Sequence, residues 1–372
     1  MSSTQVPPYG RSPLRAVQVL GGGSAGSSAH VRSIAGGLVE RGVHVTVCAP
    51  VELEHSYGFG GAGAHFLPVP RSSDPASVAA LRSACAGADV VHAHGLNAAV
   101  RTALALSGQR LPLVVTWHTR SHTEGARRHL MRLLERRAVR AATVVLGASS
   151  DLVDRARDRG ARDARLAPVA VPAPRAVGGR DGSKVRAELG AVGRPLLMAV
   201  GSLEPHRGYR TLLDAARLWQ RLDPAPLLVI AGEGRERAAL QHRVEAESLA
   251  VRLIGSSDQV TELLAAADLA LLPSRWEARS LLAQEALRLG VPLVATAVGG
   301  TPELVGGAAE LVPYGDPTAL AARVTALLAD PERRRSLAAA GRIQASSWPT
   351  EDETVAQILS VYDELMQSAV SR

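Results

Sequence analysis

The stretch ADLALLPSRWEARSLLAQEALRLGVPLVATAVGGTPELV (residues 267–305) contains the structural unit that recurs along most of this 372-residue chain. Its apolar runs at 267–273 and 291–297 show no alternation of polar and apolar residues, which is typical of strands covered on both faces of a sheet. The amphipathic segment between these runs predicts a helix. A strand, a helix and a second strand in this order predict two parallel strands joined by a crossover.

The same alternation of short apolar runs and amphipathic segments fills two parts of the chain, 14–172 and 194–345. Each part predicts a parallel sheet with helices on both faces, so the expected fold class is α/β, with two doubly wound, Rossmann-like domains. Residues 173–193 are rich in proline, glycine and charge, which is typical of a linker. The predicted strands are 16–20, 43–49, 88–94, 111–118 and 143–147, followed by 195–201, 226–234, 251–255, 267–273 and 291–297.

The last segment, 349–369, predicts an amphipathic helix with Thr350 as its N-cap and acidic residues in its first turn. We expect this helix to pack back toward the N-terminal domain. Two tandem doubly wound domains are expected to place the carboxyl ends of their strands at one cleft, where ligands bind. This organisation favours an enzyme that acts on an extended, phosphate-bearing ligand.

The composition excludes several classes of protein. Aromatic residues make up only 3% of the chain, so a stacking platform for single-stranded nucleic acid is not expected. Two cysteines, Cys48 and Cys85, without a CxxC pair exclude a zinc finger and a disulfide scaffold. No apolar run approaches the length of a membrane span and no signal peptide is visible, which predicts a cytoplasmic protein. A net charge of +7 permits anionic partners but does not choose among them.

The first predicted strand is followed by a glycine-rich turn at residues 21–26 (GGGSAG), which contains a formal GxGxxG pattern. A nicotinamide cofactor would require an acidic residue at the end of the second strand, and that strand ends in Cys48-Ala49-Pro50. The pattern is therefore weak evidence for a dinucleotide. Two interpretations stay open: a loop whose glycines let a diphosphate approach the backbone, or a tight turn that merely needs glycine.

Two carboxylates, Glu277 and Glu285, are eight positions apart in the opening stretch. Glu277 falls in the loop after a predicted strand, and Glu285 falls inside the next helix. A carboxylate can accept two strong hydrogen bonds from hydroxyl groups, which suits paired sugar hydroxyls. Backbone N–H groups of Ser280 and Leu281, near the helix start, are placed for a phosphate. The alternative is that spaced glutamates on a helix are solvated charges.

Taken with their surroundings, these residues resemble the GT-B glycosyltransferases, specifically the large retaining family-four group (glycosyl transferases group 1). Glu277-x7-Glu285, continued by ALRLGVPLVAT and GGTPELV, looks like the E-x7-E signature of that family. The resemblance covers nearly the whole chain. Further matching segments are GGGSAGSSAHVRSIAGGLVERGVHVTV (21–47), ADVVHAHG (88–95), VVTWHT (114–119), GSLEPHRGYRTLLDA (201–215) and VRLIGSSDQVTELLAAADLALLPS (251–274).

By this resemblance the chain is a retaining, hexosyltransferase-like enzyme of carbohydrate biosynthesis with two domains facing one cleft. The resemblance implies a nucleotide-diphosphate sugar, carrying UDP or GDP, as the donor substrate and a hydroxyl group of unknown identity as the acceptor. It implies a donor bound mainly to the C-terminal domain and an acceptor bound mainly to the N-terminal domain. No cofactor and no metal are expected, because protein cations neutralise the diphosphate in this fold.

The resemblance also assigns roles to residues of this sequence. His118 matches a histidine near the reacting sugar, Glu277 is expected to bind hydroxyls of the donor sugar, and Arg207 stands where the family has a lysine on the diphosphate. These three are the expected catalytic residues. The expected donor-binding residues are Gly22 and Gly23 in the glycine loop, Ser202, Arg207, Gly255 in the base-binding turn, Arg279, Ser280, Leu281, and Glu285 on the ribose.

The chain departs from the family pattern at two places. Ser202 occupies the position of the family's diphosphate arginine, and serine cannot supply the lost positive charge. Arg279 and Ser280 replace the usual Phe-Gly pair before Leu281. Arg279 could turn inward and grip two phosphate oxygens with its planar guanidinium, which would compensate for Ser202. The alternative is an arginine that faces outward.

These departures keep a second function open, that of a nucleotide-sugar-binding protein with degraded catalysis. The presence of Glu277, Glu285, Arg207 and His118 favours the transferase. A nucleotide-sugar epimerase on the same two-domain fold lacks support, because the continuation of the E-x7-E signature belongs to the transferases. Nucleic-acid binding would rest on charge alone and is not expected.

Residues 126–142 (ARRHLMRLLERRAVRAA) predict a basic amphipathic helix with Glu135 as its only opposing charge. Such a helix can lie on an anionic membrane, which would give a peripheral location at the inner face of the membrane and a lipid-linked acceptor. The other interpretation is a helix whose apolar stripe packs on the sheet while its arginine face is solvated. The expected stripe consists of Leu130, Leu134, Ala138 and Ala141.

Overall fold

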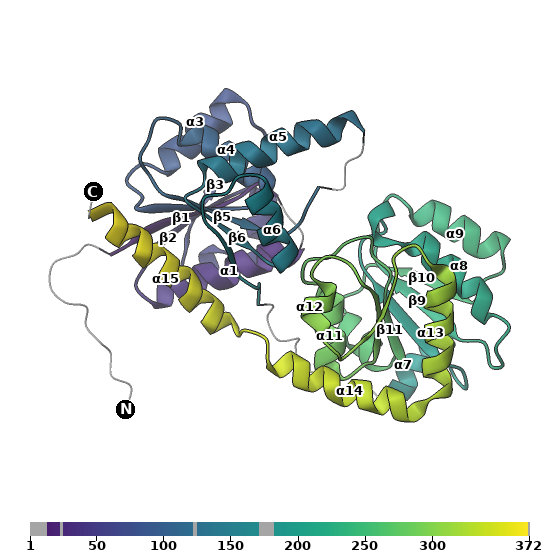
Figure 1. Cartoon of the computed structure of the whole chain (residues 1–372). Coiled ribbons are helices and arrows are strands. Elements are labelled where there is room, and N and C mark those ends of the chain that lie inside the picture. Colours follow the sequence, from purple (N-terminus) through teal and green to yellow (C-terminus); the bar gives the residue numbers. More distant parts are fainter. Residues whose placement is uncertain (1–12, 23–24, 122–124, 171–181, 371–372) are drawn as a thin grey trace, which may run out of the picture. The chain divides into compact units, whose positions relative to one another are not determined.

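The computed structural model describes residues 13–22, 25–121, 125–170 and 182–370. Contacts within the chain divide it into two compact units (Figure 1). Each unit has its own parallel sheet and its own buried core. The first unit comprises Met1–Ala148, Val153–Pro172 and Thr350–Arg372, and the second comprises Ser149–Leu152 and Ala173–Pro349.

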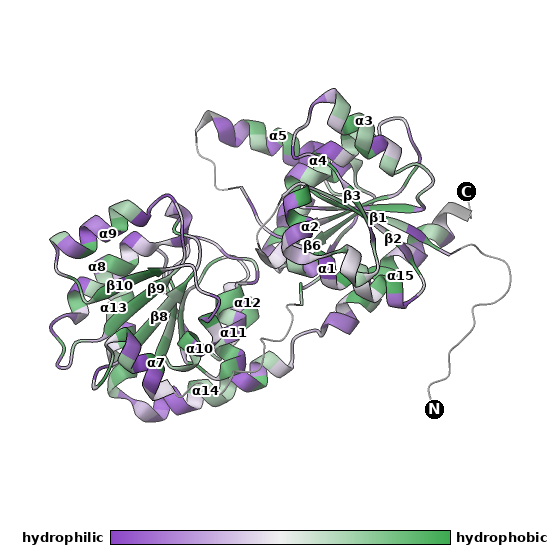
Figure 2. Ribbon diagram, turned by 180° about the vertical axis from the view of Figure 1, so that it is seen from behind, coloured by the Kyte–Doolittle hydropathy of each residue, from purple (hydrophilic) through white to green (hydrophobic). Residues whose placement is uncertain are grey.

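The first unit contains a seven-stranded parallel sheet. Its strands are β1 (Arg15–Leu20), β2 (His44–Ala49), β3 (His65–Pro68), β4 (Val90–His94), β5 (Leu113–Trp117), β6 (Val144–Gly147) and β7 (Ala164–Leu166). They lie in the order β3-β2-β1-β4-β5-β6-β7. The strand order reverses between β1 and β4, and doubly wound sheets bind ligands at the carboxyl ends of the strands at such a point. Figure 2 shows the strands as hydrophobic runs among helices of mixed polarity.

Helices follow most of these strands along the chain. They are α1 (Ala25–Glu40), α2 (Val51–Tyr57), α3 (Pro75–Ala84), α4 (Leu96–Ala105), α5 (Ala126–Ala141) and α6 (Ser150–Asp158), with a 3-10 turn at Gly60–Ala62. α1 packs its apolar side, including Val31, Ile34 and Leu38, into the core of the first unit.

A helix from far along the sequence completes that core. α15 (Glu351–Val370) lies beside α1 (Figure 1) and buries Val355, Ile358, Val361, Tyr362 and Leu365 in the same apolar cluster. The helix begins with a capping box, in which Glu353 N donates to Thr350 Oγ1 at 3.1 Å and Thr350 N donates to Glu353 Oε2 at 2.8 Å. Thr350 is therefore the N-cap, as the sequence predicts.

The second unit contains a six-stranded parallel sheet in the order β10-β9-β8-β11-β12-β13. The strands are β8 (Leu196–Val200), β9 (Leu227–Ala231), β10 (Val251–Gly255), β11 (Leu269–Leu272), β12 (Leu293–Thr296) and β13 (Glu310–Val312). Apolar clusters cover both faces of this sheet. The helices are α7 (Gly182–Leu189), α8 (Tyr209–Trp219), α9 (Arg237–Ala246), α10 (Val260–Ala265), α11 (Leu281–Leu289), α12 (Thr301–Val305), α13 (Pro317–Ala329) and α14 (Pro331–Ser346), with a 3-10 turn, η2, at Pro205–Arg207.

The two sheets confirm the predicted fold class, and every predicted strand is present. The sequence pattern does not predict β3, β7 and β13, which have only four, three and three residues and lie at sheet edges. Residues 173–193, expected as a linker, contain α7, whose Val185 and Leu189 are buried in the second core. A helix of eight residues is too short to give a clear periodic pattern.

Gly36 and Gly37, both inside α1, offer a matched pair of substitutions that tests the packing of α15. A Cβ added at Gly37 would lie 2.6 Å from Cγ2 of Val355, whereas one at Gly36 would lie 3.5 Å from Cβ of Ala62. Val355 is β-branched and buried, so it cannot turn away. We expect Gly37→Ala to lower the free energy of unfolding by about 1–3 kcal/mol, the usual cost of overpacking.

Gly36→Ala should be neutral or stabilising by up to about 1 kcal/mol, because alanine is the better helix former. Urea unfolding of the two variants measures the difference. Adding Val355→Ala to Gly37→Ala should recover part of the loss, since it removes the methyl groups that collide. Equal stabilities of the two alanine variants would contradict close packing of α1 against α15.

Candidate functional site

In the second unit, Glu277 is held in a defined position just beyond the carboxyl end of β11. It is 9% exposed, and its Oε1 accepts a hydrogen bond from Ser274 Oγ at 2.8 Å and another from Arg207 Nη1. Arg207 ends η2, which follows β8, and β8 pairs in parallel with β11, so the two loops meet at one edge of the sheet. Arg207 Nε is buried and has no hydrogen-bond partner among the described residues. This guanidinium therefore keeps an unused donor beside a fixed carboxylate.

Glycines bring the surrounding loops into direct backbone contact with this pair. A Cβ at Gly208 would lie 1.9 Å from Pro273 O, and one at Gly299 would lie 2.2 Å from Glu277 O. Gly300 N donates a hydrogen bond to Glu277 O at 2.9 Å. The Gly-Gly turn after β12 thus fixes the main chain of Glu277, and no larger residue fits at Gly299 without displacing it.

Glu285 lies on α11 and has a different partner. It is half-buried, and Thr261 Oγ1 on α10 donates a hydrogen bond to its Oε1. α11 begins at Leu281, with Ser280 as its N-cap, whose Oγ accepts a hydrogen bond from Ala283 N at 3.4 Å. The N–H group of Leu281 is one of the first-turn donors that a helix leaves without an internal partner, which suits an anion.

Ser202 lies just beyond the carboxyl end of β8, and Gly255 is the last residue of β10. Both are on the same edge of the second sheet. The Ser202 side chain is exposed, and Gly255 has a positive φ of 75°. Gly232 N donates to Gly255 O at 2.7 Å, which ties the turn after β10 to the end of β9. The structure therefore brings these two residues to the edge that carries Arg207 and Glu277.

Arg279 lies in the same loop as Glu277, but its side chain packs elsewhere. Its guanidinium carbon is 5.8 Å from the ring centroid of Trp348, and the charges that face it are those of Glu303 and Arg288. Burial lowers the pKa of Arg279 from its ordinary value. Within the described residues, no hydrogen bond or ion pair is seen between Arg279 and Arg207 or Glu277. Compensation for Ser202 by Arg279 therefore stays a prediction.

In the first unit, the glycine-rich turn follows β1. A Cβ at Gly21 would lie 2.9 Å from Ala98 N of α4, so this glycine permits a close approach of two backbones. Gly22 has a positive φ of 92° and lies beside Arg71, whose Nε would be 3.3 Å from an added Cβ. Gly23, the third residue of the predicted loop, lies outside the described residues. Arg71 is a cation beside this turn that the sequence pattern does not indicate.

A cavity of about 310 Å³ opens beside this turn, at the carboxyl ends of β4 and β5. Gly22 borders it, His94 ends β4, and His118 follows β5. Arg120, Arg155 and Glu135 also line the cavity, and Glu135 pairs with Arg155 at 2.6 Å. The predicted catalytic histidine therefore faces a space that could hold a small polar ligand.

Four histidines of the first unit gather at this cavity: His94 and His118 line it, and His30 and His92 pack against them. Burial lowers the pKa of His118 to about 4 and that of His92 to about 3, and it holds the pKa of His30 and His94 well below the ordinary value. All four rings are therefore neutral at pH 7, and each has one N–H donor and one acceptor nitrogen. Among the described residues, no cluster of His, Cys, Asp and Glu side chains is arranged to hold a metal ion.

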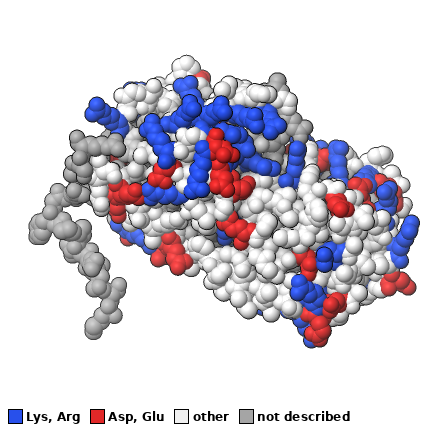
Figure 3. Space-filling model, in the orientation of Figure 1, with Lys and Arg blue, Asp and Glu red and all other residues white. Residues whose placement is uncertain are grey.

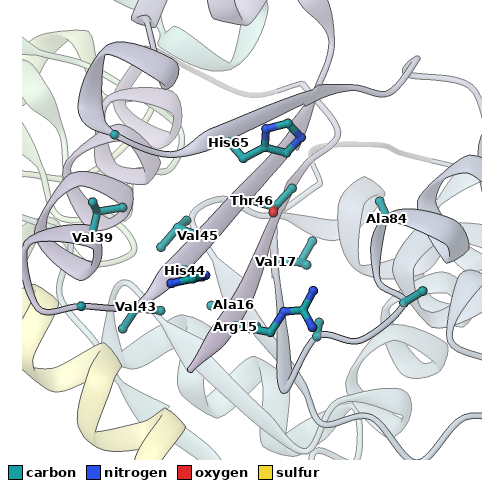
Figure 4. Close-up of a pocket in the computed structure, with 14 residues that line it drawn as sticks. Arg15, Ala16, Val17, Val39, Val43, His44, Val45, Thr46, His65 and Ala84 are labelled. Atoms are coloured by element: carbon teal, nitrogen blue, oxygen red, sulfur yellow. The ribbon is translucent and has the colours of Figure 1, made fainter. Parts of the chain in front are cut away.

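A larger cavity, of about 520 Å³, opens at the opposite end of the same sheet (Figure 4). Arg15, His44 and His65 border it at the amino ends of β1, β2 and β3, and all three side chains are exposed. Much of the remaining wall is alanine, valine and glycine. Ligands of doubly wound sheets bind at the carboxyl ends of the strands, so the smaller cavity is the better candidate site.

The basic helix α5 differs from the expected amphipathic pattern. Leu130 and Leu133 are 53% and 61% exposed, and Ala141 of the predicted stripe is exposed as well. Glu135 is buried and pairs with Arg155 at 2.6 Å and with Arg159 at 2.8 Å, so it does not oppose the arginine face. Figure 3 shows basic side chains gathered over this part of the first unit, and the six arginines of α5 are all exposed.

Across the part of the chain that the structure describes, no helix combines the length and the hydrophobicity that a membrane crossing requires.

Two known sequence families match this chain. The family described as "Glycosyl transferases group 1" matches residues 183–344, and the "Glycosyl transferase 4-like domain" matches residues 25–172. The first match contains Arg207, Glu277 and Glu285, and the second contains His118.

The chain is similar to several characterised proteins over part of its length. It is 33% identical over 156 residues to 2-deoxystreptamine N-acetyl-D-glucosaminyltransferase of Streptomyces fradiae, covering 40% of this chain and 37% of the relative. It is 37% identical over 175 residues to glycogen synthase of Mycobacterium tuberculosis, covering 44% of this chain and 41% of the relative. The matches thus span less than half of each relative.

The fold of this chain is also similar to the folds of solved structures. The Anabaena protein HepE, crystallised in complex with UDP, superposes with a TM-score of 0.79 over 94% of this chain and 100% of that chain, at 21% sequence identity. This likeness shows the two-sheet fold.

Proposed function

Because the chain belongs to the glycosyl transferases group 1 family, we propose that it is a retaining glycosyltransferase, which moves a sugar from a nucleotide-diphosphate sugar to a hydroxyl acceptor. The observation that carries this proposal is the fixed pair of Arg207 and buried Glu277 at the carboxyl edge of the second sheet. Sugar hydroxyls can donate to Glu277, and diphosphate oxygens can accept from the guanidinium of Arg207, whose side chain is 27% exposed.

We assign Glu285 to the ribose of the donor. Thr261 holds one oxygen of this carboxylate by a hydrogen bond, and the carboxylate retains further lone pairs for ribose hydroxyls. UDP in the complex of HepE supports a UDP-sugar as the donor, and a GDP-sugar is the alternative. The N-terminal turn of α11 at Leu281 and the end of β10 at Gly255 are assigned to the phosphate and the base.

The proposed chemistry places negative charge on the departing diphosphate. Fixed donors aimed at that charge are usually the largest catalytic contribution, and here Arg207 and backbone N–H groups supply them without a metal ion. A double displacement would need a carboxylate placed as a nucleophile. Glu277 is already held by Arg207 and Ser274, which favours a front-side route: the bond from the anomeric carbon to phosphate breaks, the bond to the acceptor oxygen forms on the same face, and the acceptor proton passes to the phosphate.

We assign the acceptor to the cavity that His118 faces in the first unit. Its wall of histidine, asparagine, arginine and glutamate suits a polar acceptor that carries hydroxyl groups. The exposed leucines and arginines of α5 add a second candidate partner, an anionic membrane that would present a lipid-linked acceptor.

The donor assignment is tested by thermal shift and by turnover of nucleotide sugars. We expect UDP-glucose or GDP-mannose to raise the Tm, since a ligand at 100 times its Kd stabilises the folded state by about 2.7 kcal/mol. Glu285→Ala should abolish most of this shift, and Glu332→Ala, which changes an exposed glutamate on α14 of the same unit, should leave it intact. A shift without any release of UDP or GDP would favour the alternative function, a nucleotide-sugar-binding protein with degraded catalysis.

The two arginines near Glu277 make separate predictions. Arg207→Ala should lower turnover by about 10²–10³, the scale for removing one donor to the transition state. Because Arg279 packs on Trp348, we expect Arg279→Ala to lower the Tm and to change turnover much less. If Arg279→Ala instead matches Arg207→Ala in turnover, and Ser202→Arg restores part of the loss, then Arg279 compensates for the missing cation.

Sedimentation with liposomes tests the membrane contact of α5. Binding should rise with the fraction of anionic lipid and fall with added salt, because exposed arginines attract the negative surface within a Debye length. The double variant Leu130→Ser/Leu133→Ser should weaken binding. Ile343→Ser serves as the control, because Ile343 is 72% exposed on α14, outside the basic helix. Equal binding of both variants would leave α5 an ordinary solvated surface.

A further inference from the structure

We propose that Gln18, on β1, is a positioning residue that sets which ring nitrogen of His118 carries the proton. It acts through His94 on β4 and is anchored by Tyr362 on α15, and neither Tyr362 nor Gln18 lines the cavity that His118 faces. The inference rests on the proposed function in one respect: that function gives His118 a role toward the acceptor or the donor sugar. The tautomer itself is a property of the first unit alone.

The evidence is a continuous series of hydrogen bonds between buried side chains. His118 Nε2 lies 3.3 Å from His94 Nδ1, and His94 Nε2 lies 2.8 Å from Gln18 Oε1. Gln18 Nε2 donates to Tyr362 Oη at 2.8 Å. Tyr362 Oη lies 2.8 Å from His92 Nδ1, and His92 Nε2 lies 2.6 Å from Thr116 Oγ1. The series therefore runs from the cavity wall, through the core, and back to β5.

The direction of each bond follows from the Gln18 amide. Its oxygen can only accept, so His94 must carry its proton on Nε2 and accept at Nδ1. His118 must then donate from Nε2 to that nitrogen. Each of these rings is neutral at pH 7 and has a single N–H, so each proton is used once.

The other half of the series is fixed in the same way. Tyr362 Oη accepts from the Gln18 amide, so its own proton is free to be donated to His92 Nδ1. His92 then carries its proton on Nε2 and donates it to Thr116 Oγ1. His92, His94 and His118 are thus all Nε2–H tautomers. If the amide were reversed, all three would be Nδ1–H tautomers.

The Gln18 amide sets which of these two states holds, because its oxygen can only accept and its nitrogen can only donate, whereas the Tyr362 hydroxyl can donate or accept toward either partner. Tyr362 is fully buried, and α15 holds it against the core of the first unit, where its hydrogen bond anchors the amide. The edge-on packing of His30 against His118, with ring centroids 5.3 Å apart, helps to keep the His118 ring in place. His118 consequently offers Nδ1 as an acceptor, so a substrate hydroxyl that reaches this nitrogen must donate to it.

The tautomers can be read directly from two-bond ¹H–¹⁵N spectra of the full chain labelled with ¹⁵N-histidine at pH 7. We expect His92, His94 and His118 to show the Nε2–H pattern. In Tyr362→Phe, the Gln18 amide loses the hydrogen bond that anchors it, and we expect His94 and His118 to show both tautomers or the Nδ1–H form. Tyr314→Phe, which removes the same oxygen from a side chain that is 41% exposed in the second unit, should leave the spectra unchanged.

Three observations would overturn the proposal: Nδ1–H tautomers in the parent protein, protonated rings at pH 7, or an unchanged His118 signal in a folded Tyr362→Phe variant. Should Tyr362→Phe fail to fold, Gln18→Met breaks the same series at its centre with a side chain of similar size. It should likewise release His118 from the pure Nε2–H form.

Turnover provides a second readout. We expect Tyr362→Phe to lower kcat by about 10- to 100-fold, the scale for removing a group that orients a functional histidine, with the Kd of the nucleotide sugar unchanged. A parent protein with the expected tautomers but no transferase activity would reject the proposed function and keep the tautomer assignment. Normal kcat in a variant whose His118 tautomer has changed would reject the positioning role.

Discussion

The candidate site of the second unit depends on loops whose main chains pack so closely that no side chain fits between them. At the carboxyl edge of that sheet, Gly208 meets the carbonyl of Pro273, and Gly232 meets the carbonyl of Gly201, each at 1.9 Å from an ideal Cβ position. Gly299 meets the carbonyl of Glu277 in the same way. Only glycine lets these main chains pack together, because a Cβ at any of the three positions would overlap the facing carbonyl oxygen. Arg207 and Glu277 are therefore presented by a rigid edge, and their geometry does not rely on the two side chains alone.

The sequence predicts the fold well because strand burial leaves a direct pattern. Runs such as residues 227–231 are apolar throughout, and a strand covered on both faces requires this. Edge strands such as β13, which contains the charged Glu310, lack that pattern and are too short to be recognised by alternation. α7 is not predicted either, because it has only eight residues and follows a segment rich in proline and glycine.

Spacing alone predicts the candidate site only where its residues are close along the chain, whereas Arg207 and His118 are indicated by the resemblance to a family. The spacing of Glu277 and Glu285 within one strand-loop-helix unit indicates both of them. The direction of the Arg279 side chain depends on Trp348, which belongs to a different part of the second unit and has no recognisable spacing to it. Gln18 and Tyr362 are separated by 344 positions, and only tertiary packing brings them together. Nothing in a local pattern marks a buried glutamine as the member that sets the direction of a series of hydrogen bonds.

The first unit is built from segments that are far apart in the sequence, and this affects the order in which the chain folds during synthesis. Its core contains Tyr362 and Ile358, which the ribosome adds only after the entire segment from Ala173 to Pro349 has been synthesised. During translation, the second unit can therefore complete its core while the groove on α1 that Val355 will fill is still open to water. N-terminal domains generally fold first during synthesis. Here the N-terminal unit completes its core last, because it needs α15. The nascent first unit therefore exposes the apolar surface of α1 until α15 has been synthesised.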